Sequence, residues 1–165
     1  ELLAVAQPAL VPLGSPLAQT KDNQNAVVSS GTYGGETVFA GRGAGGGPTS
    51  VAVVSDLLSV AQAKAPSLAV GGDELKSYFV TGDMECAYYL RLNLRREATR
   101  SGAFQKILAK HGLEPNLTLQ KLRGLKSSPV LTLEPCRTSA VEAALQELVD
   151  AHCLSERPLA LPILG

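Results

Sequence analysis

The sequence predicts two parts, an α/β first part and an α+β second part whose elements follow the order βαββαβ. In the first part, a glycine-rich segment, residues 41–47, separates a strand-like run from a helix-like run. In the second part, apolar and polar residues alternate from Cys86 to Arg95, and an apolar helical face follows Ser139. Periods of two and of about 3.6 residues are typical of strands and of amphipathic helices.

The first part, residues 1–63, should contain three short strands and one helix. Strand-like runs lie at residues 2–6, 26–29 and 36–39. The helix should begin near residue 49, with Thr49 or Ser50 as its N-cap. Its apolar face comprises Val51, Val54, Leu58 and Ala61. These elements are too few to close a core, so we expect an apolar surface that other residues must cover.

A linker and a second sheet should follow. Glycine, proline and aspartate interrupt residues 64–83, which predicts a linker with one short strand at 78–80. In the second part, residues 84–165, four residues before Gly112 share a helical face: Phe104, Ile107, Leu108 and His111. Strand-like runs lie at 117–122, 130–134 and 159–164. This order predicts a ferredoxin-like module with two helices on one face of an antiparallel sheet.

The second helix of that module carries its own start signal. Ser139 and Glu142 have the spacing of a capping box. The helix should present an apolar face formed by Val141, Ala144, Leu145 and Leu148. His111 precedes Gly112 and suits the C-terminus of the first helix, where a cation is favoured.

Composition favours an ordinary cytoplasmic protein. The net charge is zero, 45% of the residues are hydrophobic and 18% are charged. No apolar run is long enough to span a bilayer and no basic segment opens a signal peptide, so we expect no membrane partner. Cys86, Cys136 and Cys153 form no C-x-x-C pair, and the chain has only 2 histidines. We therefore expect inert free thiols and no metal site.

The glycine-rich segment exposes backbone that a ligand could approach. Gly41, Gly43 and Gly46 fit the pattern G-x-G-x-x-G, and N–H groups at a helix start attract anions. The other parts of a dinucleotide fingerprint are missing, because no second strand follows and no acidic residue lies about 20 positions on. A P-loop is excluded, since no Gly-Lys-Ser/Thr follows. From this pattern alone, a flexible connection is an equal alternative.

The residues around this segment resemble the end of the catalytic domain of homoserine dehydrogenase. The matching segments are Pro8–Pro12, Ser15–Ala18, Asn25–Val27 and Gly41–Thr49, then Val53-Val54 and Asp56-Leu57. Ser15 replaces a usual histidine, and Ser50-Val51 replaces a usual Ala-Ser. The resemblance implies an NAD- or NADP-dependent oxidoreductase that interconverts L-aspartate 4-semialdehyde and L-homoserine in threonine, methionine and isoleucine biosynthesis.

The same resemblance implies which residues serve the reaction. Gly43 and Gly45 would contact the nicotinamide cofactor through their backbone, while Arg42 and Thr49 would shape the loop and the helix start. The family's Rossmann fingerprint, catalytic lysine and acidic residues lie upstream of the matching part. We therefore assign no catalytic residue, and we expect the chain, which begins at Glu1, to be a C-terminal fragment that is inactive alone.

The second part resembles the regulatory ACT domain around Tyr88–Leu92. Such domains pair, and they hold an amino acid near the loop between the first strand and the first helix. Here that loop is 95–102, so Ser101 and Gly102 are candidate effector residues, threonine is a candidate effector, and a homo-oligomer is expected. The family's Asp-x-Pro-Gly arrangement is absent from the loop. An amino-acid-binding or dimerisation module without catalysis is therefore the alternative function.

A nucleic-acid surface is the remaining alternative for the second part. Four arginines cluster at positions 91, 95, 96 and 100 and could contact phosphates. However, Glu97 interrupts the cluster, and Tyr88 and Tyr89 should lie on opposite faces of their strand. Because the chain is also neutral overall, we expect no nucleic-acid partner.

Overall fold

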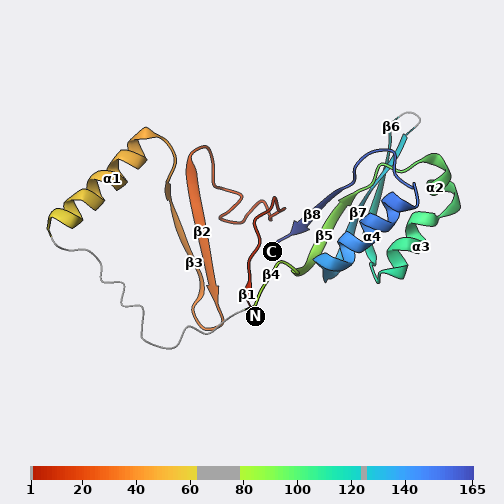
Figure 1. Cartoon of the computed structure of the whole chain (residues 1–165), viewed down its shortest axis with the longest axis horizontal. Coiled ribbons are helices and arrows are strands. Elements are labelled where there is room, and N and C mark those ends of the chain that lie inside the picture. Colours follow the sequence, from red (N-terminus) through yellow and green to blue (C-terminus); the bar gives the residue numbers. More distant parts are fainter. Residues whose placement is uncertain (1, 63–78, 124–125) are drawn as a thin grey trace. The chain divides into compact units, whose positions relative to one another are not determined.

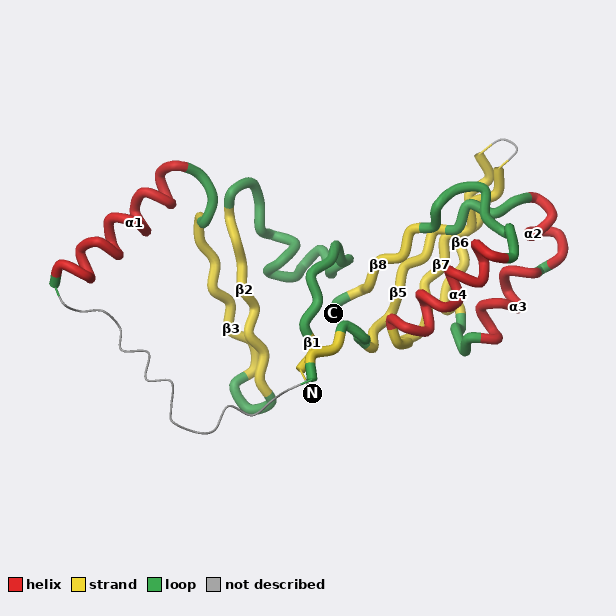
Figure 2. Tube along the Cα trace, viewed as in Figure 1, coloured by secondary structure: helices red, strands yellow, loops and turns green. Residues whose placement is uncertain are grey.

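The computed structural model describes residues 2–62, 79–123 and 126–165, which contain eight strands and four helices (Figures 1 and 2). The chain divides into two compact units. One consists of Glu1–Leu10 with Ser77–Gly165, and the other is Val11–Lys76. Most of the predicted linker, 64–83, lies outside the described residues, so the predicted domain boundaries stay a prediction.

The unit Val11–Lys76 contains a hairpin followed by a helix. Strands β2 (Gln24–Gly31) and β3 (Gly35–Arg42) pair antiparallel along their whole length. The strands predicted at 26–29 and 36–39 are the centres of this hairpin. Helix α1 (Gly46–Ala61) follows β3 closely and begins about three residues earlier than predicted.

This hairpin and helix bury almost none of their apolar surface. No residue of α1 is buried, and every residue of β3 is exposed. The exposed large apolar side chains include Val27, Phe39, Val51, Val54, Leu57, Leu58 and Val60. Because isolated helices and hairpins gain most of their stability from packing an apolar face, these elements need a covering surface.

The other unit is built on a four-stranded antiparallel sheet with strand order β6-β7-β5-β8. Its strands are β5 (Glu85–Arg91), β6 (Pro115–Arg123), β7 (Lys126–Arg137) and β8 (Leu159–Ile163). Helices α2 (Arg96–Ser101) and α3 (Ala103–Lys110) follow β5, and α4 (Thr138–Asp150) follows β7. Residues of α3 and α4 share one buried cluster with β5 and β7, so both helices cover the same face of the sheet (Figure 1).

The buried core confirms the period-two pattern of the first predicted strand. Tyr88, Leu90, Leu92 and Leu94 are all buried, whereas Arg91 between them is exposed. The predicted helical faces also point inward: Phe104 and Leu108 are buried on α3, as are Val141, Ala144 and Leu148 on α4. Within the described residues, every side chain of the apolar core lies between positions 88 and 153.

The N-terminal segment joins this unit rather than the hairpin. Strand β1 (Leu2–Leu3) pairs in parallel with β4 (Val80–Thr81). Further along, the Leu10 N–H donates to the Pro162 carbonyl at 2.8 Å, and the Leu164 N–H donates to the Leu10 carbonyl at 2.8 Å. The strand predicted at 2–6 is thus shorter than expected. Of the strand predicted at 78–80, residue 78 lies outside the described residues, residue 79 is not part of a strand, and β4 begins at Val80.

The capping box predicted at the start of α4 is wrong. The helix begins at Thr138, and its N-cap Arg137 makes no side-chain cap hydrogen bond. Instead, Asp83 accepts a hydrogen bond from the Ser139 N–H at 2.9 Å, as an N-cap carboxylate would. This backbone donor, together with the Arg137 guanidinium, lowers the pKa of Asp83. A residue assigned to the linker therefore caps the helix from outside.

A carboxylate on α4 also ties it to α3. Glu147 lies 2.8 Å from Lys110 Nζ and 2.8 Å from His111 Nε2. Lys110 and then His111 lower the pKa of Glu147. His111 is the C-cap of α3, and Gly112 follows with a positive φ of 68°, which confirms the predicted helix end.

No helix within residues 2–62, 79–123 and 126–165 has the length and apolar character needed to cross a bilayer.

Removing the external cap should weaken the unit in a pH-dependent manner. We expect Asp83→Ala to lower the urea midpoint at pH 7, because the Ser139 N–H loses its acceptor. The pKa of Asp83 is below its ordinary value of 3.8 in the folded state. Its contribution is therefore complete above that value and is lost as the pH falls through the folded pKa. Urea titrations followed by circular dichroism, from pH 7 to below pH 3.8, should show that the difference between the urea midpoints of the wild type and Asp83→Ala shrinks as the pH falls.

A matched variant separates charge from hydrogen bonding at this position. Asp83→Asn keeps an acceptor, so its midpoint at pH 7 should lie between those of the wild type and Asp83→Ala. A gap between wild type and Asp83→Ala that persists unchanged in acid would contradict the capping role.

Neighbouring residues of α4 should respond very differently to truncation. Leu148 is 0% exposed and Val149 is 47% exposed. Leu148→Ala should cost about 2–5 kcal/mol in the free energy of unfolding, because it leaves a cavity in the core. Val149→Ala should change that free energy by only about 0.5 kcal/mol. If denaturant unfolding gave equal losses for Leu148→Ala and Val149→Ala, the assignment of Leu148 to the core and Val149 to the surface would be wrong.

Candidate functional site

The glycine-rich segment forms a very short connection between β3 and α1. Arg42 is the last residue of β3, and Gly46 is already the first residue of α1. Only residues 43–45 lie between the two elements. The N-cap predicted at Thr49 or Ser50 is wrong, since Gly45 occupies that position.

Two hydroxyl groups bond back to carbonyls at the start of α1. Thr49 Oγ1 donates to the Gly45 carbonyl at 2.9 Å, and Ser50 Oγ donates to the Gly46 carbonyl at 2.7 Å. Pro48 fits there because the first-turn N–H groups have no partner within a helix. The hydroxyls predicted to cap α1 therefore bond back to its first turn.

Two glycines of the loop differ in how strongly the structure restricts their replacement. Gly45 has φ 102° and ψ 159°, a backbone conformation that residues with a side chain almost never adopt. At Gly43, the side-chain amide of Asn25 occupies the space that a Cβ would need. Of the two predicted cofactor-contacting glycines, the backbone conformation therefore demands only Gly45, because the exposed side chain of Asn25 can turn away from Gly43.

Asparagines at the start of β2 hold this loop in place. Asn23 Nδ2 donates to the Ala44 carbonyl at 3.0 Å, and the Gly43 N–H donates to the Asn23 carbonyl at 3.3 Å. Asn23 was not among the residues predicted to shape this loop. The available signal was a pair of asparagines around Gln24, because asparagine side chains commonly bond to nearby backbone in turns.

The N-terminus of α1 is open to an anionic ligand. Its first turn contains no acidic residue, and no side chain caps it. The helix is 16 residues long, so the partial positive charge at its N-terminus adds to the unpaired N–H groups. Arg42 ends β3 beside this turn and is exposed. Such a constellation suits the phosphate or carboxylate of a ligand.

The chemistry available here is binding rather than proton transfer. Loop residues 43–45 supply only backbone groups, and the hydroxyl of Thr49 is engaged with the Gly45 carbonyl. Among the residues that the structure describes, no three His, Cys, Asp or Glu side chains gather in a way that could hold a metal ion.

The predicted effector loop contains a helix, contrary to expectation. Within 95–102, residues Arg96–Ser101 form α2, and Gly102 joins it to α3 with a left-handed φ of 66°. Ser101 lines a cavity of about 310 Å³, together with Arg95, Glu97, Ala98, Ala103, Ala151, His152 and Cys153. The structure thus places Ser101 at a cavity and Gly102 at the helix junction.

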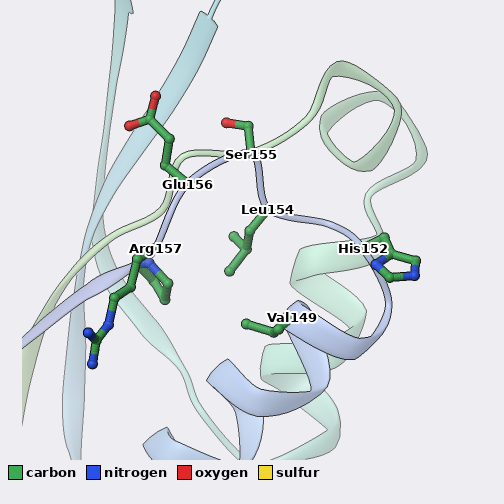
Figure 3. A pocket seen from close by; sticks show the side chains of 7 residues that line it. Val149, His152, Leu154, Ser155, Glu156 and Arg157 are labelled. Atoms are coloured by element: carbon green, nitrogen blue, oxygen red, sulfur yellow. The ribbon is translucent and has the colours of Figure 1, made fainter.

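A second hollow lies where α4 ends. It has a volume of about 430 Å³ and is lined by Val149 and by residues of the loop 152–158. Figure 3 shows the polar groups of His152, Glu156 and Arg157 pointing in different directions, with Leu154 and Val149 between them. Because these groups do not converge, the hollow has no evident catalytic arrangement.

Substitutions at two glycines should have opposite effects on α1. Gly45→Ala places a side chain in a glycine-only conformation and should cost about 1–3 kcal/mol locally. Gly46→Ala lies in the first turn of the helix, where a Cβ would meet nothing within 4 Å, and should stabilise it by about 0.4–1 kcal/mol. Amide hydrogen exchange across α1 should therefore accelerate in the first variant and slow in the second. Acceleration in both would contradict the observed N-cap.

Comparisons with known proteins agree on one family. The family model for homoserine dehydrogenase matches residues 2–58. The homoserine dehydrogenase of Helicobacter pylori is 29% identical over 155 residues, covering 92% of this chain and 37% of that protein. The Bacillus subtilis enzyme is also 29% identical, over 159 residues, covering 91% of this chain and 36% of that protein.

A solved structure extends the similarity to the mixed α/β fold. The crystal structure of a homoserine dehydrogenase from Thiobacillus denitrificans matches with a TM-score of 0.77 and 26% identity, covering 96% of this chain and 38% of that one. The chain thus spans between 36% and 38% of the length of these relatives. By sequence and by structure, the chain is similar to members of the homoserine dehydrogenase family.

Proposed function

We propose that this chain is the C-terminal part of an NAD- or NADP-dependent homoserine dehydrogenase, which interconverts L-aspartate 4-semialdehyde and L-homoserine. The observation that carries the proposal is the uncapped N-terminus of α1, within the segment 2–58 that matches the family. The enzyme would act in the cytoplasm, in the biosynthesis of threonine, methionine and isoleucine.

The loop residues fit a role in holding the cofactor. The nicotinamide cofactor would accept or supply the hydride. Gly43 and Gly45 would offer backbone close to it, and Arg42 would supply positive charge. Thr49 would act indirectly, because its hydroxyl fixes the carbonyl of Gly45 at 2.9 Å. No side chain of α1 competes with a ligand for the free N–H groups, since the helix has no side-chain cap.

The exposed apolar side chains of α1 and the hairpin support dependence on a larger catalytic domain. Residues such as Val51, Leu57 and Phe39 are exposed in this chain. In the complete enzyme, the part of the relatives that this chain does not match would cover them and would supply the groups that react. This chain alone would then have no dehydrogenase activity.

We further propose that residues 84–165 form an ACT-like module for regulation or dimerisation. The antiparallel sheet order β6-β7-β5-β8, with α3 and α4 on one face, supports this proposal. The cavity beside Ser101 contains both Arg95 and Glu97, which could pair with the carboxylate and ammonium groups of an amino acid such as threonine. A homo-oligomer that pairs two such modules, without a ligand, is the second possibility for this part.

The enzymatic proposal is tested by restoring the missing part. We expect the 165-residue chain alone to show no homoserine-dependent reduction of NAD or NADP. A fusion of the unmatched N-terminal part of the Bacillus subtilis enzyme to this chain should show it. In that fusion, Gly45→Val should lower kcat/KM at least about tenfold, or about 1.4 kcal/mol, because it disturbs the loop beside the cofactor.

A glycine outside the loop provides the matched control. Gly34→Ala lies in the hairpin turn, where a Cβ would meet nothing within 4 Å, and should leave kcat/KM unchanged. Turnover by this chain alone would refute its dependence on the missing part. A fusion that folds and binds nucleotide but does not oxidise homoserine would refute the enzymatic assignment.

A further inference from the structure

Two of the three cysteines face each other across the central strand pair. Cys86 of β5 lies directly opposite Cys136 of β7 in the antiparallel ladder. Both side chains are partly buried and pack against the same core cluster, so they lie on the same face of the sheet. Opposed residues in such a ladder have Cα atoms about 4.5–5.5 Å apart, within the roughly 4.4–6.8 Å that a disulfide spans. The Cα spacing of this register is therefore compatible with a disulfide.

Electrostatic effects indicate that the two thiols are close neighbours. Burial raises the pKa of Cys136, and the charge of Cys86 raises it further. Burial also raises the pKa of Tyr88, with smaller contributions from Cys86 and Cys136. Cys86, Cys136 and Tyr88 thus form one group of neighbouring titratable side chains on β5 and β7.

This group lies where several elements meet. The Tyr88 hydroxyl and Thr138 Oγ1 are 2.7 Å apart, and the Thr138 N–H donates to the Met84 carbonyl at 2.9 Å. The ladder between β5 and β7 also shifts register between Cys86 and Tyr88. A covalent link at Cys86 would therefore fasten an irregular part of the ladder, beside the start of α4.

We propose that Cys86 and Cys136 are a modification site, at which a peroxide oxidises the pair to a reversible intramolecular disulfide. One thiolate attacks a peroxide oxygen, which breaks the O–O bond and leaves a sulfenic acid and, after protonation, one water. The second thiol then attacks that sulfur, forms the S–S bond and releases a second water. Two thiols and one hydrogen peroxide thus give one disulfide and two waters, and a dithiol reductant reverses the change.

Cys153 serves as the internal control. It is 5% exposed, it contacts the Ala151 carbonyl through its sulfur at 3.7 Å, and it lies on neither strand of the Cys86–Cys136 pair. The structure therefore assigns the oxidation to one pair of the three cysteines and leaves Cys153 as a thiol.

The test uses the full chain treated with hydrogen peroxide under native conditions, then denatured and alkylated. The number of alkylated thiols should fall from the 3 of the reduced chain to one, and the mass before alkylation should fall by about 2 Da for the two hydrogens lost. Peptide mapping should find Cys86 joined to Cys136. The oxidised chain should run as a monomer on a non-reducing gel and unfold at higher urea, and dithiothreitol should reverse both the mass change and the urea shift.

Single variants decide between this pair and general thiol oxidation. Cys86→Ser and Cys136→Ser should each keep two alkylated thiols after peroxide, whereas Cys153→Ser should lose both of its remaining thiols. A disulfide that includes Cys153, a link between two chains, or a folded chain that retains all three thiols would each overturn the proposal. A disulfide that forms only after urea denaturation would overturn it as well.

Discussion

Burial of the inner face of β5 is the interaction on which the described core depends. This strand lies between β7 and β8 in the sheet, and its residues Tyr88 and Leu90 are almost fully buried beneath α3 and α4. Leu92, just beyond the strand, is 0% exposed as well. Since apolar burial is the main favourable contribution to folding, a sheet with helices on one face can offset the entropy lost by ordering its chain.

The unit Val11–Lys76 lacks the corresponding second layer. Its hairpin is fully paired along both strands, but backbone pairing alone gives a two-stranded ribbon only marginal stability. Helix α1 is exposed on all sides in the described structure. Both elements have apolar side chains suited to packing, so the sequence is adapted to a partner surface that these residues do not provide. The family comparisons give the same picture, because the chain spans only 36% to 38% of its relatives.

The sequence predicted those features that depend on local periodicity. Alternation around Tyr88 and Leu90 identified the central strand, and the apolar spacing of Phe104 and Leu108 identified α3. Features set by contacts between distant residues were missed. Asp83 caps α4 from 56 positions away in sequence, so the local pair of Ser139 and Glu142 was mistaken for the cap.

Strand register and loop conformation could not be predicted from the sequence either. Nothing in the spacing of Cys86 and Cys136 indicated that they would be opposed in one ladder, because register becomes visible only when the strands are paired. The start of α1 was also misplaced, since three consecutive glycines favour a loop by propensity. In the structure, Gly46 and Gly47 nevertheless begin the helix, and the hydroxyls of Thr49 and Ser50 bond back to the carbonyls of Gly45 and Gly46.

Geometry also changes which feature of the glycine-rich loop points to function. Gly45 is required by its own φ of 102°, so the chain would need this glycine even without a ligand. The number of glycines is therefore weak support for a cofactor. The first turn of α1 is different, because the conformation of Gly45 excludes an aspartate or serine side chain that could satisfy its N–H groups at the N-cap. A glycine there leaves the positive end of a 16-residue helix uncapped, and that open end favours an anionic ligand.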